Sequence, residues 1–237
     1  MDRANTLPRP LAVAAILLAI LAPLPTYGGR PLSTEDASVL GEGRCQLETW
    51  IDRSRDATVG WLVPACNVGA NIEWQVGGAR TRAEGSHRFS EAYAQAKTVF
   101  TAEDAPWGVG LVAGVSRRPL QEAHRGWVNP YVIVPVTIAI GEGALHLNAG
   151  WARDRLEDRD VTLWGVAGEM PAGERLTLVA EAFGENSERP FLRAGGRWSV
   201  VKDVFDVDFT VVAKPGGTRD ERFVSLGVFW QSDRFLK

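Results

Sequence analysis

Histidine is the side chain from which catalysis or metal binding near neutral pH is most often built. The sequence has three, His87, His124 and His146. His146 and Asn148 are the one suggestive pair, because a histidine activates a serine nucleophile when a third group orients its ring. No serine lies beside this pair. His87 and His124 fall in separate predicted loops, so the sequence predicts no catalytic site, no metal site and no cofactor.

The two cysteines have the spacing of a cross-strand pair. If the chain turns at residues 55–56, one antiparallel register places Cys45 opposite Cys66 and Trp50 opposite Trp61. We therefore predict a Cys45–Cys66 disulfide in a first β-hairpin, which would stabilise the fold by about 2–4 kcal/mol. Two unpaired buried thiols are the alternative.

The amino terminus has the pattern of a signal peptide. Arg3 and Arg9 precede the apolar run Leu11–Ala22, which is too short to cross a bilayer core of about 30 Å as a helix. Cleavage is predicted near Tyr27 to Gly29, and an exported chain can form disulfides. The predicted division is a signal peptide at residues 1–28, a periplasmic N-terminal lead-in at 29–43 and a single folded domain at 44–237.

Composition limits the class of the remaining chain. Its length of roughly 210 residues suits one all-β domain. The net charge is −3 without a run of basic residues, and because nucleic-acid-binding proteins usually cluster Lys and Arg, nucleic acid is excluded as a partner. Nine Trp and 25 Gly against two Met suit a β-barrel with aromatic belts at the membrane interfaces.

Apolar and polar residues alternate with period two along the chain, and the spacing of an amphipathic helix is rare. In residues 71–78, Trp74 and Val76 share one face while Glu73 and Gln75 share the other. The same split is found at residues 145–151, 205–211 and 224–231. The predicted fold class is therefore all-β.

Eleven turn or loop signals divide the chain, which predicts about twelve strands of about ten residues each. The odd-numbered connections are mostly charged and the even-numbered ones mostly short, as in barrels with outer loops and short periplasmic turns. We therefore predict a transmembrane antiparallel up-and-down β-barrel with both termini in the periplasm. Pro130 and Pro135 cannot donate to a ladder, so a bulge is predicted between Trp127 and Ala139.

A soluble barrel or sandwich with its apolar face turned inward is the alternative. Its outer face would carry many Lys and Glu, whereas the polar faces here are rich in amides, small residues and glycine. Such faces suit a crowded, wet lumen, so we assign the apolar faces to lipid.

A family resemblance starts directly after the signal peptide. Residues 30–37 (RPLSTEDA), 41–43 (GEG) and 46–48 (QLE), with the ending GVFW at 227–230, resemble a bacterial group named after the meta-pathway of phenol degradation. Members of that group look like outer-membrane barrels and are often labelled transporters. The resemblance implies a link to the uptake of small aromatic or hydrophobic compounds, and it assigns no site residues.

Period-two register turns the polar faces of the strands into the lumen. A barrel of about twelve strands lies between small barrels filled by side chains and wide porins, so a narrow pore is predicted. Whether its charges form a selective constriction or salt bridges that close the barrel stays open. The predicted lumen-facing residues are Glu73, Glu91, Gln95, Lys97, His146, Asn148, Glu181, Arg193, Arg197, Asp206 and Asp208.

The leading functional hypothesis is an outer-membrane channel or transporter that passes small molecules, aromatic or hydrophobic ones included, by passive diffusion. The alternatives are a non-conducting structural or interaction barrel and, more remotely, a lipid hydrolase, because one outer-membrane phospholipase is a twelve-stranded barrel that uses Ser, His and Asn. The expected partners are outer-membrane lipid and lipopolysaccharide, a small-molecule solute and the barrel-assembly machinery.

Overall fold

The computed structural model describes residues 29–83, 86–101, 105–119, 128–155, 157–186, 188–218 and 221–232, so the predicted signal peptide lies outside the described residues. Within these ranges the chain forms twelve β-strands. They are β1 Cys45–Arg53, β2 Ala57–Asn67, β3 Ile72–Ala83, β4 Ser86–Val99, β5 Trp107–Arg117, β6 Asn129–Ile140, β7 Gly143–Asp154, β8 Arg159–Pro171, β9 Leu176–Glu185, β10 Phe191–Val201, β11 Phe205–Ala213 and β12 Arg222–Gln231.

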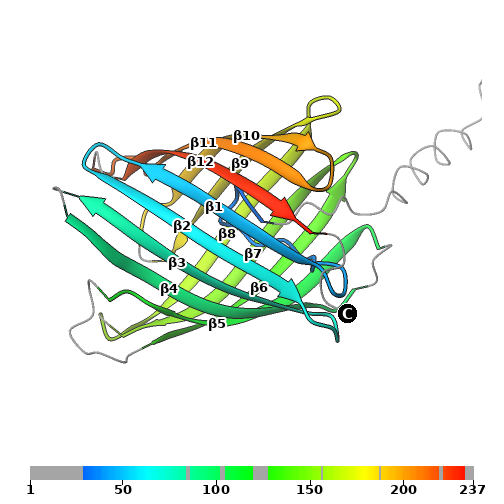
Figure 1. Ribbon diagram of the computed structural model, residues 1–237. Helices are drawn as coiled ribbons and strands as arrows, with labels where there is room; N and C mark the ends of the chain where they lie inside the picture. Colours follow the sequence, from blue (N-terminus) through cyan, green and yellow to red (C-terminus); the bar gives the residue numbers. More distant parts are fainter. Residues whose placement is uncertain are drawn as a thin grey trace, which may run out of the picture.

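The sheet closes on itself. Each strand pairs antiparallel with its neighbours in the sequence, and β1 pairs with β12 (Figure 1). The predicted up-and-down barrel is therefore confirmed. Across the described ranges, no helix is long and apolar enough to cross a membrane. We call the end at which β1 begins and β12 ends the terminal end, and the opposite one the loop end.

The first hairpin has the predicted register. Cys45 pairs with Cys66 and Trp50 with Trp61. The cysteines form a disulfide, and the two indole rings stack with their centroids 5.2 Å apart. One turn position therefore explains both pairs, and the prediction of a disulfide is confirmed.

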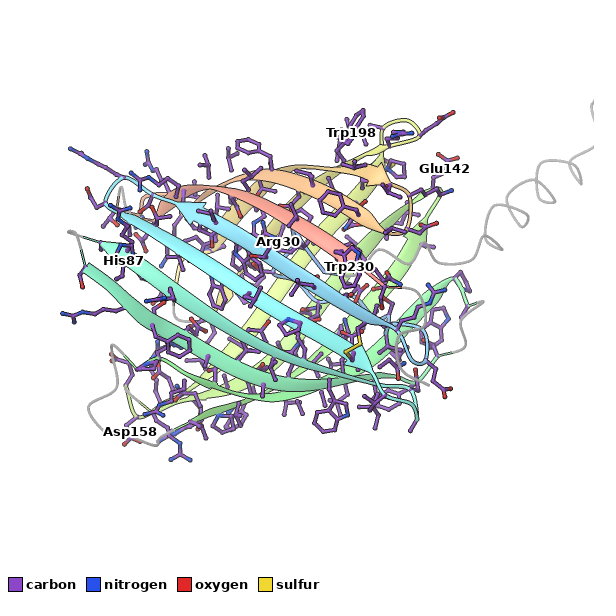
Figure 2. All side chains as sticks on the ribbon, viewed as in Figure 1. Arg30, His87, Glu142, Asp158, Trp198 and Trp230 are labelled. Atoms are coloured by element: carbon purple, nitrogen blue, oxygen red, sulfur yellow. A yellow bond between two sulfur atoms is a disulfide. The ribbon has the colours of Figure 1, made fainter. Side chains whose placement is uncertain are left out.

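The two faces of the wall differ in polarity as the alternation predicts. On β11, Phe209 is 52% exposed on the outer face while the neighbouring Thr210 is fully buried on the inner face. On β12, Leu226 is 56% exposed and Ser225 is fully buried. Figure 2 shows Trp198 and Trp230 near the terminal end, and His87 and Asp158 at the loop end. The outer face is thus an apolar belt with indole rings toward its edge.

The bulge predicted near Pro130 and Pro135 is wrong for the described part of that segment, because β6 keeps one register with both neighbours. The β5–β6 ladder instead skips from Val109 to Val112, opposite Pro135. Proline has no N–H group to donate, so the ladder is interrupted without an extra residue. Register shifts occur elsewhere, after Ala79 and after Ser199.

A charge on the outer face should destabilise the barrel. Leu226→Arg places a guanidinium in the middle of the apolar belt and should lower the free energy of unfolding by about 2–4 kcal/mol. Urea-induced unfolding from lipid vesicles measures the loss. Val224→Arg, one row closer to the loop end, is the matched control and should cost less. Equal, negligible costs at both positions would contradict the assignment of this face to lipid.

Candidate functional site

Residues 29–43, here called the internal segment, lie against the inner wall of the barrel, where Figure 1 shows them in dark blue behind β1 and β2. Arg30, Thr34, Asp36 and Ala37 are all buried. Hydrogen bonds join the segment to strands on opposite sides of the barrel, for example to Glu181 on β9 and to Glu73 on β3. The segment therefore crosses the lumen. The sequence predicted a periplasmic lead-in at residues 29–43, whereas these contacts place the segment inside the barrel.

Arg30 anchors the start of the internal segment beside the seam where the barrel closes (Figure 2). Its Nη2 lies 2.7 Å from both Asp208 Oδ1 and Ser225 Oγ. Its backbone N–H donates to Glu48 Oε1 at 3.1 Å, and its carbonyl accepts from Arg197 at 2.9 Å. One residue of the segment thus joins β1, β10, β11 and β12.

Glu181 on β9 holds the next turn of the segment. Its carboxylate accepts the backbone N–H groups of Ser33 at 2.8 and 2.9 Å and of Thr34 at 3.0 Å. Arg193 lies 3.5 Å from the same carboxylate and donates to the carbonyl of Pro31. This buried acid is therefore neutralised by one arginine while it orients two peptide groups.

Lys97 on β4 binds the acidic part of the internal segment. Its Nζ lies 2.8 Å from Asp36 Oδ1 and 3.1 Å from Glu35 Oε2. Gln95 donates to Glu35 at 2.9 Å. Asn148 on β7 accepts the Glu35 N–H at 2.8 Å and donates to the Glu35 carbonyl at 2.7 Å. Side chains from two parts of the wall, three strands apart, thus hold the same stretch of the segment.

Asp36 is buried but charged. Burial raises the pKa of this carboxyl, while the charge of Lys97 and hydrogen bonds from Lys97 and Ser38 lower it, and the net pKa lies below the ordinary value. A depressed pKa in the folded state means that the ion pair stabilises the fold above the ordinary pKa of an aspartate. That contribution is lost only as the pH falls through the depressed value.

His146 on β7 is buried and contacts the neighbouring strand β6. Its Nδ1 lies 2.9 Å from Thr137 Oγ1, which also accepts the N–H of Ala37 at 2.8 Å. Its Nε2 is buried and has no hydrogen-bond partner among the described residues. No described serine is bonded to the ring. Asn148 thus bonds the internal segment directly, whereas His146 is connected to it through Thr137.

The end of the segment returns to the wall near the terminal end. The Leu40 N–H donates to Glu73 Oε2 at 2.9 Å, and Asn67 Nδ2 donates to the Leu40 carbonyl at 2.6 Å. The Gly43 N–H then donates to the Asn67 carbonyl at 2.9 Å. These contacts lead the chain into β1.

A cavity of about 1670 Å³ runs beside the internal segment. Its lining includes Arg175 and Lys202 at the terminal end and Asp52 and Phe223 near the loop end. The lumen is therefore narrowed but not filled. Aromatic side chains also contribute to its lining, namely Trp50, Trp61, Tyr93, Phe183, Phe191, Phe223 and Phe229.

Six of the predicted lumen-facing residues line the cavity, and four of them also bond the internal segment. The six are Glu73, Glu91, Lys97, Arg193, Arg197 and Asp206. The other five are engaged around the internal segment and are not part of the cavity lining: Gln95, His146, Asn148, Glu181 and Asp208. Neighbouring strands bring Arg197 to 3.8 Å from Asp206. Asp208, which pairs with Arg197 in register, instead binds Arg30.

Residues of two kinds are missing from the predicted set. Arg30, Glu35 and Asp36 lie in the internal segment, and period-two reasoning assigns no face to a segment without strands. Glu48 and Glu169 lie on β1 and β8, where both are buried and Glu169 is 2.9 Å from Arg197. Alternation along β1, with polar residues at 46, 48 and 52, is the signal that would have identified Glu48.

A family model described as uncharacterised conserved protein UCP029691 matches residues 16–229. The chain belongs to this family. Its description contains no link to the phenol meta-pathway group, so that resemblance stays a prediction. No curated protein sequence matches the chain.

Solved structures share the architecture at low sequence identity. A KdgM porin in complex with disordered oligogalacturonate has a TM-score of 0.58 at 8% identity, covering 78% of this chain and 98% of that one. A NanC porin has a TM-score of 0.54 at 9% identity, covering 81% and 99%. Outer membrane phospholipase A from Escherichia coli has 0.50 at 11%, covering 85% and 94%. At these identities the likeness extends to the fold alone.

The ion pair of Lys97 and Asp36 should be strongly coupled. In a double-mutant cycle with Lys97→Met and Asp36→Asn, we expect a coupling free energy above about 1 kcal/mol, because both groups are buried and in direct contact. Urea-induced unfolding of the four proteins measures it. The matched control is the more exposed pair Arg153 and Asp160, 3.4 Å apart, with an expected coupling below about 1 kcal/mol. Similar small values for both pairs would contradict a firmly held segment.

Proposed function

We propose that this protein is an outer-membrane channel through which small molecules diffuse passively past the internal segment. The observation that carries the proposal is the cavity, whose lining reaches from residues at the terminal end to residues near the loop end. The lining carries both signs of charge, including Glu91, Arg193 and Asp206. A passage of this kind selects solutes by size and by electric field.

Aromatic compounds are the solute class that the lining favours. The stacked Trp50 and Trp61, with Tyr93 tilted at 6.5 Å from Trp61, form an aromatic surface on β1, β2 and β4. On the other side, Phe183 and Phe191 stack at 5.6 Å, with Arg193 lying over Phe183. Planar rings bind such surfaces by offset stacking, and anionic groups bind the adjacent cation.

The proposal includes a location. The chain is exported with residues 1–28 as a signal peptide, and the barrel-assembly machinery inserts it into the outer membrane of a Gram-negative cell. β1 begins and β12 ends at the same end of the barrel, where the Ser232 N–H donates to the Cys45 carbonyl at 2.8 Å. We place this terminal end in the periplasm, because short turns usually face that side.

A non-conducting structural barrel is the second candidate. It is favoured by the buried contacts that hold the internal segment across the lumen, since such ion pairs also close and rigidify small barrels. A lipid hydrolase has less support: His146 faces inward, away from lipid, and bonds to Thr137 rather than to a described serine.

Electrical recording separates the channel from the structural barrel. The folded protein in a planar bilayer should pass a steady current, and Asp206→Asn should shift the cation-to-anion permeability ratio toward anions because Asp206 lines the cavity. Asp208→Asn is the matched control, since Asp208 is bound to Arg30, and it should mainly lower stability. A correctly folded protein that passes neither current nor solute would end the channel proposal.

The solute preference can be tested with two anions of equal charge. Benzenesulfonate should permeate faster than methanesulfonate relative to their mobilities in water, because only the former stacks on indole rings. Trp61→Ala should reduce this ratio at least twofold, whereas Trp198→Ala, on the outer wall, should leave it unchanged. A ratio that is the same in all three proteins would remove the aromatic preference and leave the channel itself standing.

A further inference from the structure

Four arginines gather on the outer wall at the loop end, on the lipid side rather than in the lumen. Arg53 on β1, Arg80 and Arg82 on β3, and Arg222 on β12 are exposed. Each shares its face with exposed apolar side chains of the same strand, such as Ile51, Val76 and Val224. We call these four residues the arginine cluster.

Strand pairing places the cluster in rows. Arg53 pairs with Thr58, and Thr58 pairs with Arg82, so two arginines flank one threonine across three strands. Neighbouring strands are about 4.8 Å apart, which puts the Cα atoms of Arg53 and Arg82 roughly 10 Å from each other. The row continues on β4 with His87, which pairs with Arg82 and which Figure 2 shows at the loop end.

The next row toward the membrane centre combines charge with apolar surface. Ile51 pairs with Gly60, Gly60 with Arg80, and Arg80 with Phe89. A Cβ atom added to Gly60 would meet no atom within 4 Å. A shallow open site therefore lies on β2, with arginines beside it and above it and apolar side chains around it.

The cluster has no acidic side chain beside it on the described outer faces of its own and the neighbouring strands. Among the described residues, the outer faces of β12, β1, β2, β3 and β4 carry no Asp or Glu. None of the four guanidinium groups forms an ion pair with a described carboxylate, and Arg53 bonds only to Thr58 Oγ1. Arg153 on β7 is different, because Asp158 and Asp160 neutralise it. On the described strands, the cluster is thus a positive patch at the edge of the apolar belt.

We propose that the arginine cluster binds the phosphate groups of lipopolysaccharide, with the acyl chains of that lipid lying on the apolar belt below. A guanidinium group can donate two parallel hydrogen bonds to two oxygens of one phosphate. A lipid with two phosphates can therefore contact arginines on neighbouring strands at once. The arrangement fits a ligand whose anionic groups lie at the loop end and whose hydrocarbon chains extend toward the membrane centre. The inference rests on the proposed placement of the loop end in the outer leaflet.

The test uses the full folded chain and purified diphosphoryl lipid A. Native mass spectrometry from detergent micelles should give a Kd for the wild-type protein, and the double variant R80Q/R82Q should bind at least tenfold more weakly. Arg153→Gln is the matched control and should stay within twofold of wild type. Lipid A stripped of its phosphates should bind no better to the wild type than to the double variant.

Two further measurements keep the test decisive. Gly60→Asp adds a negative charge to the open site without removing an arginine, and it should also weaken lipid A binding at least tenfold. This variant tests the proposal even if the double variant fails to fold. Bilayer current of both variants should match wild type, because the cluster faces away from the lumen, so failure of this site and failure of the channel are distinguishable. Equal affinity of the variants and the wild type for diphosphoryl lipid A, or equal binding of the dephosphorylated lipid, would overturn the proposal.

Discussion

A backbone N–H or C=O group that faces hydrocarbon must find its hydrogen-bond partner within the chain, because lipid offers none. The pairing of β1 with β12 meets this constraint by removing both edges of the sheet. Closure then forces each strand to show one face to lipid and one to an enclosed space. The division into an apolar outside and a polar inside follows from that single requirement.

An enclosed polar space creates a second problem, because charges inside a narrow barrel are poorly hydrated and need partners. The wall supplies some of them: Arg197 pairs with Glu169 across neighbouring parts of the lumen. The internal segment supplies others, since Arg30 meets Asp208, and Asp36 meets Lys97. The wall and the segment are thus electrostatically complementary, and the inner surface is complete only when the segment is in place.

Charges are paired differently on the inner and outer faces of the barrel wall. Inside, cations and anions are matched closely, and aromatic side chains line the free volume between them. Outside, the four residues of the arginine cluster form no ion pair with a described carboxylate, whereas Arg153 on β7 pairs with Asp158 and Asp160. A fixed charge left unbalanced beside an apolar belt is stabilised by an anionic lipid more readily than by water alone.

The fold could be predicted from the sequence because alternating side chains and turn residues recur along the chain. Alternation identifies the faces of β3, β7, β11 and β12, and turn residues locate the connections, because a strand's side-chain period is exact and turns demand particular residues. The first hairpin is the clearest case, since the cysteine pair and the tryptophan pair require the same register. Proline was less informative: it forbids a hydrogen bond, but whether a bulge or an interrupted ladder results depends on the partner strand.

The amino-acid sequence by itself determined the barrel, its approximate strand count, the disulfide and the two faces of the strands that alternate most clearly. All of these follow from the order of neighbouring residues. Only the tertiary structure decided where residues 29–43 lie and which charges meet. Arg30 and Asp208 are 178 positions apart, and no local period connects them. Their contact exists because closure of the sheet places every inward side chain around one shared space, which the segment then crosses.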